Sequence, residues 1–204
     1  MTCRLDLRNN YLTSLTEFTF RDLSGLRYLF LTNNRVYRIE RRALRLLRQL
    51  LYLVLRGNPL TDLERMHFHT PSALSYIDMS ECGLTAVPRG LPESLRYVQL
   101  RRNNFTVLAT DSFAQCPQVN ILVLDENRIH TIHNATFTTM PHLQQVTAKT
   151  SLCFSFSFNY LRLVFVKNYY KSIFGILSYT GVGVYSRAPY GCPTLKVILT
   201  KEIK

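Results

Sequence analysis

The stretch LRYVQLRRNN, residues 95–104, places leucine, valine and leucine at spacings of three and two and then ends on asparagine. The alternation of Val98 and Leu100 with polar neighbours is typical of a short strand with one buried face. An asparagine side chain after such a strand can satisfy backbone polar groups at a turn, which an apolar side chain cannot do. The stretch therefore predicts a strand that is followed by a turn.

The same pattern recurs along residues 1–148. Copies start at residues 2, 26, 50, 74, 95, 119 and 143, so the intervals are 24, 24, 24, 21, 24 and 24. Other columns keep the same phase, and the fourteenth position reads Leu15, Ile39, Leu63, Val87, Leu108 and Ile132. A fixed period of this size predicts a solenoid, in which each unit buries its apolar face against the next one.

These columns resemble the leucine-rich repeat family from residue 2 to about 148. The resemblance implies an α/β solenoid, with a parallel β-sheet on the concave face and irregular or 3₁₀ turns on the convex face. Units of 24 residues with Phe at position 19 are similar to the extracellular type. The short unit GLTAVPRGLPESL, residues 83–95, resembles the short repeats of small leucine-rich proteoglycans and related matrix proteins. Two features depart from that subgroup: three long units precede the short one, and its N-terminal cysteine cluster is absent.

The resemblance implies a non-enzymatic, secreted module of the extracellular matrix or cell surface that binds a protein ligand, such as collagen or a growth factor. The alternatives are a fragment of a leucine-rich repeat receptor ectodomain and an intracellular leucine-rich repeat scaffold. The sequence contains no GxSxG, HExxH or phosphate-binding glycine loop, so no catalytic residue, cofactor or metal is expected.

Charge and hydropathy constrain the partners further. The net charge of +12 favours acidic partners, but no nucleic-acid recognition module is visible, so nucleic-acid binding is not expected. No apolar run reaches the roughly 18 to 20 residues of a membrane span, and no signal peptide is apparent at the start of this chain.

Positions 3, 5, 7 and 8 of each repeat are expected to face outward from the sheet, because strand side chains alternate between the two faces. Asp78 and Ser80 are among them, and four tyrosines share one column. Tyr and Arg are enriched at interface hot spots, so this face is the predicted binding surface. Its predicted partner-binding residues are Tyr28, Phe30, Tyr52, Val54, Arg56, Tyr76, Tyr97 and Arg101. The alternative interpretation is that neighbouring tyrosines stack along the sheet and stabilise it.

A second candidate surface is the arginine-rich segment RVYRIERRALRLLRQL, residues 35–50. Its leucines at positions 19 and 22 are expected to point inward, which places the arginines outside. Arg38, Arg41, Arg42 and Arg45 are the predicted binding residues for sulfated glycosaminoglycan or another polyanion. A merely solvated face is the alternative.

Two triplets, Asn104-Phe105-Thr106 and Asn134-Ala135-Thr136, fit the N-glycosylation signal of a secreted chain. Two cysteines occupy core columns of the repeat. Cys82 replaces the asparagine of its unit, and Cys116 aligns with leucine and methionine, so both are predicted to be structural thiols.

The repeat pattern is lost from about residue 149. Residues 1–148 contain 17 Arg and no Lys, whereas residues 149–204 contain 6 Lys and 2 Arg and are rich in aromatic side chains. We therefore expect residues 1–148 to be truncated, uncapped repeats, and residues 149–204 to be a tail unrelated to them. The tail is interpreted as intron-derived or as a gene-model error. The alternatives are a β-rich cap and a basic aromatic segment that lies on a membrane surface.

Overall fold

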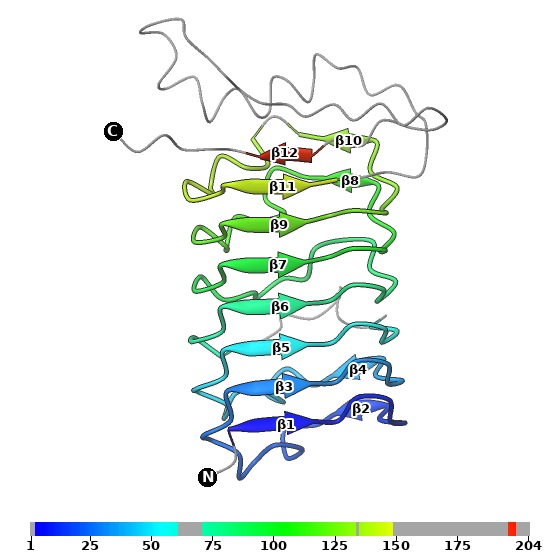
Figure 1. Ribbon diagram of the computed structural model, residues 1–204, viewed down its shortest axis with the longest axis vertical. Helices are drawn as coiled ribbons and strands as arrows, with labels where there is room; N and C mark the ends of the chain where they lie inside the picture. Colours follow the sequence, from blue (N-terminus) through cyan, green and yellow to red (C-terminus); the bar gives the residue numbers. More distant parts are fainter. Residues whose placement is uncertain (1–2, 61–70, 134, 149–195, 199–204) are drawn as a thin grey trace, which may run out of the picture.

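The computed structural model describes residues 3–60, 71–133, 135–148 and 196–198, and in it short strands stack into a ladder (Figure 1). Seven strands pair in parallel in chain order, and an eighth pairs antiparallel with the last of them. They are β1 (Arg4–Asp6), β3 (Tyr28–Phe30), β5 (Tyr52–Val54), β6 (Tyr76–Asp78), β7 (Tyr97–Gln99), β9 (Ile121–Val123), β11 (Gln145–Thr147) and β12 (Lys196–Ile198). The predicted leucine-rich repeat solenoid is confirmed.

The strand register reproduces the repeat intervals one by one. Arg4 pairs with Tyr28, Tyr28 with Tyr52 and Tyr52 with Tyr76, each 24 residues apart. Tyr76 then pairs with Tyr97 across the short unit, at a separation of 21 residues. The two remaining steps, from Tyr97 to Ile121 and from Ile121 to Gln145, are again 24 residues. The three residues by which the short unit is shorter than the others are therefore missing outside the strand, and the strand alignment is preserved.

A second row of two-residue strands lies apart from the main sheet (Figure 1). β2 (Ser14–Leu15) pairs in parallel with β4 (Arg38–Ile39), and β8 (Val107–Leu108) with β10 (Thr131–Ile132). The segments that follow contain turns closed three residues apart, such as Arg21 N–H to the Phe18 carbonyl at 3.2 Å. Within the described ranges there is no helix, and so none that is long and apolar enough to cross a membrane.

The core is formed by inward side chains of both rows of strands and of the turns that follow them. The inward strand residues are fully buried, among them Leu29, Leu53 and Val98 at 0% exposure. Phe113 and Phe137, at repeat position 19, stack with ring centroids 6.2 Å apart. Each fully buried aliphatic or aromatic side chain contributes about 1.5–3 kcal/mol relative to exposure, so the repeated columns are the main source of stability.

Buried asparagines connect the ends of β3, β5, β7 and β9 to the preceding repeat. Asn58 Oδ1 accepts the Val36 N–H at 3.0 Å, while its Nδ2 donates to the Leu31 and Leu55 carbonyls at 2.9 and 2.7 Å. Asn34, Asn103 and Asn127 make equivalent bonds and are also buried. These bonds satisfy backbone groups that would otherwise be buried without a partner, as the sequence predicted.

Cys82 takes the asparagine position in the fourth repeat. Its side chain is 1% exposed, and the thiol donates to the Leu55 and Ser80 carbonyls at 3.4 and 3.3 Å. Cys116 is 2% exposed in the same core. Burial raises the pKa of each thiol to about 12. Both cysteines are structural, as predicted.

The residue at repeat position 8 adopts a left-handed backbone conformation in each of the first six repeats. The φ values lie between 54° and 72° for Asn9, Asn33, Gly57, Glu81, Arg102 and Glu126. Gly adopts this conformation freely and Asn does so with a small penalty, whereas Glu81, Arg102 and Glu126 are each strained by about 1–2 kcal/mol. The repeated turn is thus imposed by the stacking of the solenoid, and it aligns the position-8 side chains in one row.

Of the predicted tail, only β12 lies within the described residues. Gln145, Val146 and Thr147 of β11 pair with Ile198, Val197 and Lys196 in antiparallel register. β12 therefore covers the free edge of β11 and does not continue the parallel repeat. The proposed origin of the tail stays a prediction.

Candidate functional site

Four tyrosines form a continuous stack across the face of the main sheet. We call Tyr28, Tyr52, Tyr76 and Tyr97 the tyrosine ladder. Neighbouring ring centroids are 5.1–5.2 Å apart and the ring planes are inclined by 25–29°. Tyr52 is 39% exposed and the other three are half-buried. The parallel register forces this contact, because each tyrosine lies directly opposite the next one. The stacking proposed from sequence is therefore present.

Phe30 and Val54 extend the apolar strip at the next outward position. Both are half-buried. Two cations cover Phe30, since the guanidinium carbons of Arg4 and Arg8 lie 4.8 and 5.8 Å from its ring centroid. The apolar strip therefore runs from Phe30 through Val54 beside the tyrosine ladder, with a cationic border at its N-terminal end.

Asp78 and Ser80 differ from the sequence prediction. Both were expected to be exposed, yet they are 7% and 3% exposed. The Ser80 N–H donates to Asp78 Oδ1 at 2.9 Å, and the Ser80 hydroxyl has no hydrogen-bond partner within the described part of the chain. The prediction was wrong because strand alternation fixes the face on which a side chain lies, but not how far its neighbours cover it.

Tyr76 is also partly buried by neighbouring side chains. Burial, followed by the negative charge of Asp78, raises the pKa of the Tyr76 hydroxyl to about 12. Gln99 Nε2 donates to that hydroxyl oxygen at 3.0 Å. The Tyr76 phenol is thus neutral at physiological pH and fixed in orientation, so the centre of the tyrosine ladder offers a rigid contact surface.

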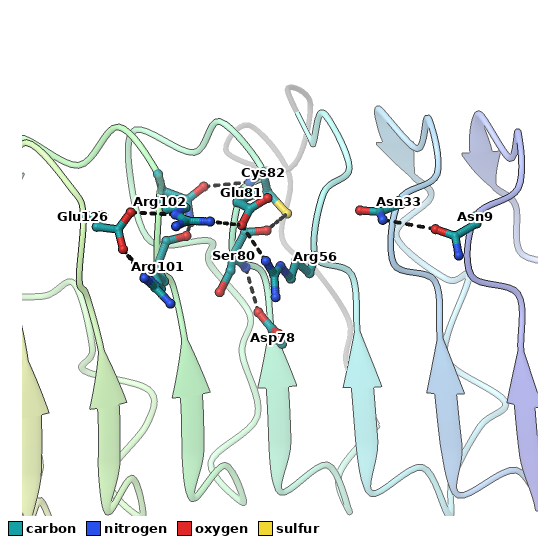
Figure 2. A network of polar contacts seen from close by, with 11 residues as sticks. Asn9, Asn33, Arg56, Asp78, Ser80, Glu81, Cys82, Arg101, Arg102 and Glu126 are labelled. Atoms are coloured by element: carbon teal, nitrogen blue, oxygen red, sulfur yellow. Dashed lines mark hydrogen bonds and ion pairs between the residues drawn. The ribbon is translucent and has the colours of Figure 1, made fainter.

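A chain of five alternating charges crosses the carboxyl ends of β5, β6, β7 and β9 (Figure 2). This ion-pair chain runs Arg56–Glu81–Arg102–Glu126–Arg101. Arg56 Nη2 lies 2.8 Å from Glu81 Oε1, and Arg102 contacts Glu81 at 3.1 Å and Glu126 at 2.6 Å. Arg56 and Arg101 were predicted to bind a partner directly. In the structure each is paired with a glutamate of the neighbouring repeat.

The arginines keep both glutamates ionised. For Glu81, burial raises the pKa, but hydrogen bonds from Arg102 and Arg56 together outweigh it and lower the pKa below its usual value. Hydrogen bonds from Arg102 and then Arg101 lower the pKa of Glu126. The ion-pair chain therefore persists through the physiological pH range. Screening by salt weakens such exposed pairs, so each adds little to stability.

The arginine-rich segment lies on a different surface. We call residues 11–18 and 35–48 the arginine flank. Arg38, Arg41, Arg42 and Arg45 are all exposed there, as predicted. Arg38 belongs to β4, and the other three lie on the turn that follows it. The arginine flank is built on the second row of strands, so it is separate from the tyrosine ladder of the main sheet (Figure 1).

The two candidate glycosylation positions differ in what the structure describes. Asn104 is exposed, its N–H donates to the Leu84 carbonyl at 2.7 Å, and Thr106 is also exposed. Asn134 lies outside the described residues. Within the described ranges, no group of three or more His, Cys, Asp or Glu side chains is arranged to hold a metal ion.

Sequence reasoning missed two features of these surfaces. The pairing of Glu81, Arg102 and Glu126 was not anticipated, although their alternating signs in the position-8 column were a usable signal. Tyr11 and Phe18 were not singled out either, yet they are 76% and 65% exposed. Their repeat positions carry no inward-facing column, which could have indicated their exposure.

The leucine rich repeat family model matches residues 3–60 and 93–149. Podocan of Mus musculus is 33% identical over 145 residues, which are 70% of this chain and 20% of podocan. Biglycan of Sus scrofa is 28% identical over 69% of this chain and 43% of biglycan. Decorin of Rattus norvegicus is 27% identical over 66% of this chain and 38% of decorin. The chain thus spans less than half the length of each of these relatives.

Solved structures agree on the fold. TLR13 in its complex with ssRNA13 superposes with a TM-score of 0.69 at 22% identity, over 74% of this chain and 22% of the TLR13 chain. Human 5T4 gives a TM-score of 0.50 at 21% identity, over 72% of this chain and 69% of the 5T4 chain. The repeat intervals, the strand register and the family match agree: the chain belongs to the leucine-rich repeat family, and the members it resembles are the small leucine-rich proteoglycans.

Proposed function

We propose that the chain is a non-enzymatic, extracellular, matrix-associated module that binds a protein ligand on the tyrosine ladder. The observation that carries this proposal is the unbroken stack of four tyrosines, bordered by Phe30 and Val54, on a solvated sheet face. A contiguous aromatic and apolar strip of this kind usually marks an interaction surface. Similarity to podocan, biglycan and decorin supports the extracellular placement.

The physical basis is preorganisation. A tyrosine offers a large amphipathic contact area with few rotatable bonds, so little conformational entropy is lost on binding. In the ladder each ring is already held by its neighbours, which lowers that cost further. Collagen and secreted growth factors are the partner classes that the resemblance to matrix proteoglycans favours, and we propose them as the first ligands to test.

The test compares two variants of the full chain by surface plasmon resonance on immobilised type I collagen and on a panel of secreted growth factors. Y52A/Y76A/Y97A removes the centre of the tyrosine ladder. Y11A/Y37A removes two exposed tyrosines of the arginine flank and is the matched control. Each central hot spot contributes about 2 kcal/mol or more, but such losses are not additive, so we expect the ladder variant to lose at least about 3 kcal/mol, a factor of about 100 in affinity. The control should bind like the wild type.

Because the tyrosines also stack on one another, circular dichroism and the unfolding midpoint must first establish that the ladder variant is folded. The single variant Tyr52→Ala, at the most exposed ring, provides a second measurement with a smaller effect on stacking. Unchanged affinity in folded ladder variants would refute the proposed surface. Failure of the wild type to bind any of these proteins would refute the proposed partner classes.

A further inference from the structure

The positive charge of the repeats is concentrated in one place. Residues 11–48 contain eight arginines and three carboxylates, a net charge of +5. The whole stretch 1–148 also has a net charge of +5, so its other residues sum to zero. Charge that served only solubility would be spread over all the repeats, whereas here the whole excess of positive charge lies on two of them.

Backbone pairing assembles part of this charge into the arginine flank. The Arg35 N–H donates to the Leu12 carbonyl at 2.9 Å, and the Tyr37 N–H donates to the Thr13 carbonyl at 3.0 Å. Between β2 and β4, Arg38 then lies opposite Ser14. The next residue of each strand, Leu15 and Ile39, is buried, so Arg38 is directed to solvent.

The turn after β4 exposes three further arginines. Its N–H groups donate to carbonyls three residues earlier, as from Arg45 to Arg42 at 3.0 Å. Ala43, Leu44 and Leu47 are buried by this turn, at 3%, 1% and 0% exposure. Arg41, Arg42 and Arg45 therefore point outward because their neighbours fill the core.

Two carboxylates, Glu17 and Glu40, share the arginine flank, but neither forms an ion pair with these cations in the described part of the chain. Glu40 is the only acidic residue between positions 35 and 48, and its Oε2 accepts the Glu17 backbone N–H at 3.0 Å. Among the described residues, Arg38, Arg41, Arg42 and Arg45 form no ion pair. In the ion-pair chain of the main sheet, by contrast, Arg56, Arg101 and Arg102 are all compensated.

Exposed aromatic rings accompany the arginines. Tyr11, Phe18 and Tyr37 are 76%, 65% and 47% exposed, and they are three of the five large apolar side chains that are exposed within the described ranges. The Arg35 guanidinium carbon lies 4.7 Å from the Tyr11 ring centroid. An arginine and aromatic surface of this composition is typical of a recognition site.

We propose that the arginine flank binds a sulfated polysaccharide, independently of the tyrosine ladder. Planar guanidinium groups donate paired hydrogen bonds to oxyanions and remain charged at every physiological pH. The electron-rich faces of Tyr11 and Tyr37 can pack against the C–H face of a sugar ring. The cations are spread along the strand and turn of residues 35–48, an extended arrangement that suits a chain with repeating negative charges.

The experiment measures binding of a heparin decasaccharide to the full chain by isothermal titration calorimetry at 150 mM NaCl. R41A/R42A/R45A removes three charges from the arginine flank. R89A/R96A/R128A removes three exposed, unpaired arginines elsewhere in the described residues, so both variants keep the same net charge. Exposed charge contacts contribute about 0.5 kcal/mol each, so the flank variant should bind about 10-fold more weakly. The control should lose less than about 3-fold.

Three outcomes would overturn the proposal. An equal loss in both variants would mean that heparin senses net charge alone, including the basic tail. Tighter binding of a single-stranded oligonucleotide of matched charge, lost in the same variant, would assign the flank to nucleic acid. Loss of heparin binding in Y52A/Y76A/Y97A would contradict the claim that the arginine flank binds independently of the tyrosine ladder. The variant R41Q/R42Q/R45Q, which keeps longer side chains on the turn, repeats the measurement if the alanine version unfolds.

Discussion

Replacing Asn103 by alanine tests whether the buried asparagines hold the repeats together. Asn103 Oδ1 accepts the N–H groups of Cys82 and Leu84 at 3.1 and 3.0 Å. Its Nδ2 donates to the carbonyls of Met79 and Leu100 at 2.9 and 3.0 Å. The side chain is 4% exposed, so Asn103→Ala leaves four buried backbone groups without these partners.

The expected cost follows from those four bonds. A typical hydrogen bond contributes about 1 kcal/mol net, and a buried group left unsatisfied costs about 1–3 kcal/mol. Entry of a water molecule into the space would offset part of the loss, so we expect Asn103→Ala to lower the free energy of unfolding by about 3–4 kcal/mol. That is a large share of the roughly 5–15 kcal/mol that stabilises a typical domain.

The matched control is Asn10→Ala, from the same column of the first repeat. Asn10 is exposed, and its Nδ2 donates to the Leu7 and Arg8 carbonyls at 3.0 and 3.1 Å, where water can replace it. We expect a loss below about 1 kcal/mol. Urea unfolding followed by far-ultraviolet circular dichroism measures both values. Equal losses in the two variants, or a loss below about 1 kcal/mol for Asn103→Ala, would refute the role assigned to this column.

Two further predictions concern single side chains. Burial raises the pKa of the Cys82 and Cys116 thiols to about 12, so both should stay protonated and unlabelled by iodoacetamide at pH 8 in the folded chain, while the exposed Cys3 reacts. Peptide mapping by mass spectrometry checks this prediction. Labelling of Cys82 without denaturant would contradict it. Asn104 should carry an N-linked glycan when the chain is produced through a secretory pathway, since its side chain is exposed. Enzymatic deglycosylation should then convert Asn104 to aspartate. An unmodified Asn104 in the secreted chain would count against the prediction.

The sequence by itself determined the solenoid. Leu95, Val98, Leu100 and Asn103 recur at fixed intervals, and side-chain alternation along a strand depends only on local backbone geometry. Each unit can bury its apolar face only against its neighbours, so the period also fixed which strands pair and in which register. The tyrosine column, the buried asparagines and the exposure of Arg41, Arg42 and Arg45 followed from the same rule.

The tertiary structure alone decided which outward side chains are covered and which charged ones pair across repeats. Asp78 and Ser80 are buried by their neighbours, and Arg56 pairs with Glu81 although 25 residues separate them. Such contacts depend on which rotamers neighbouring side chains adopt and on the left-handed turn at position 8, and neither is encoded in the hydrophobic period. The period specifies the face on which each side chain lies, whereas packing between repeats decides which of those side chains remain free to bind a partner.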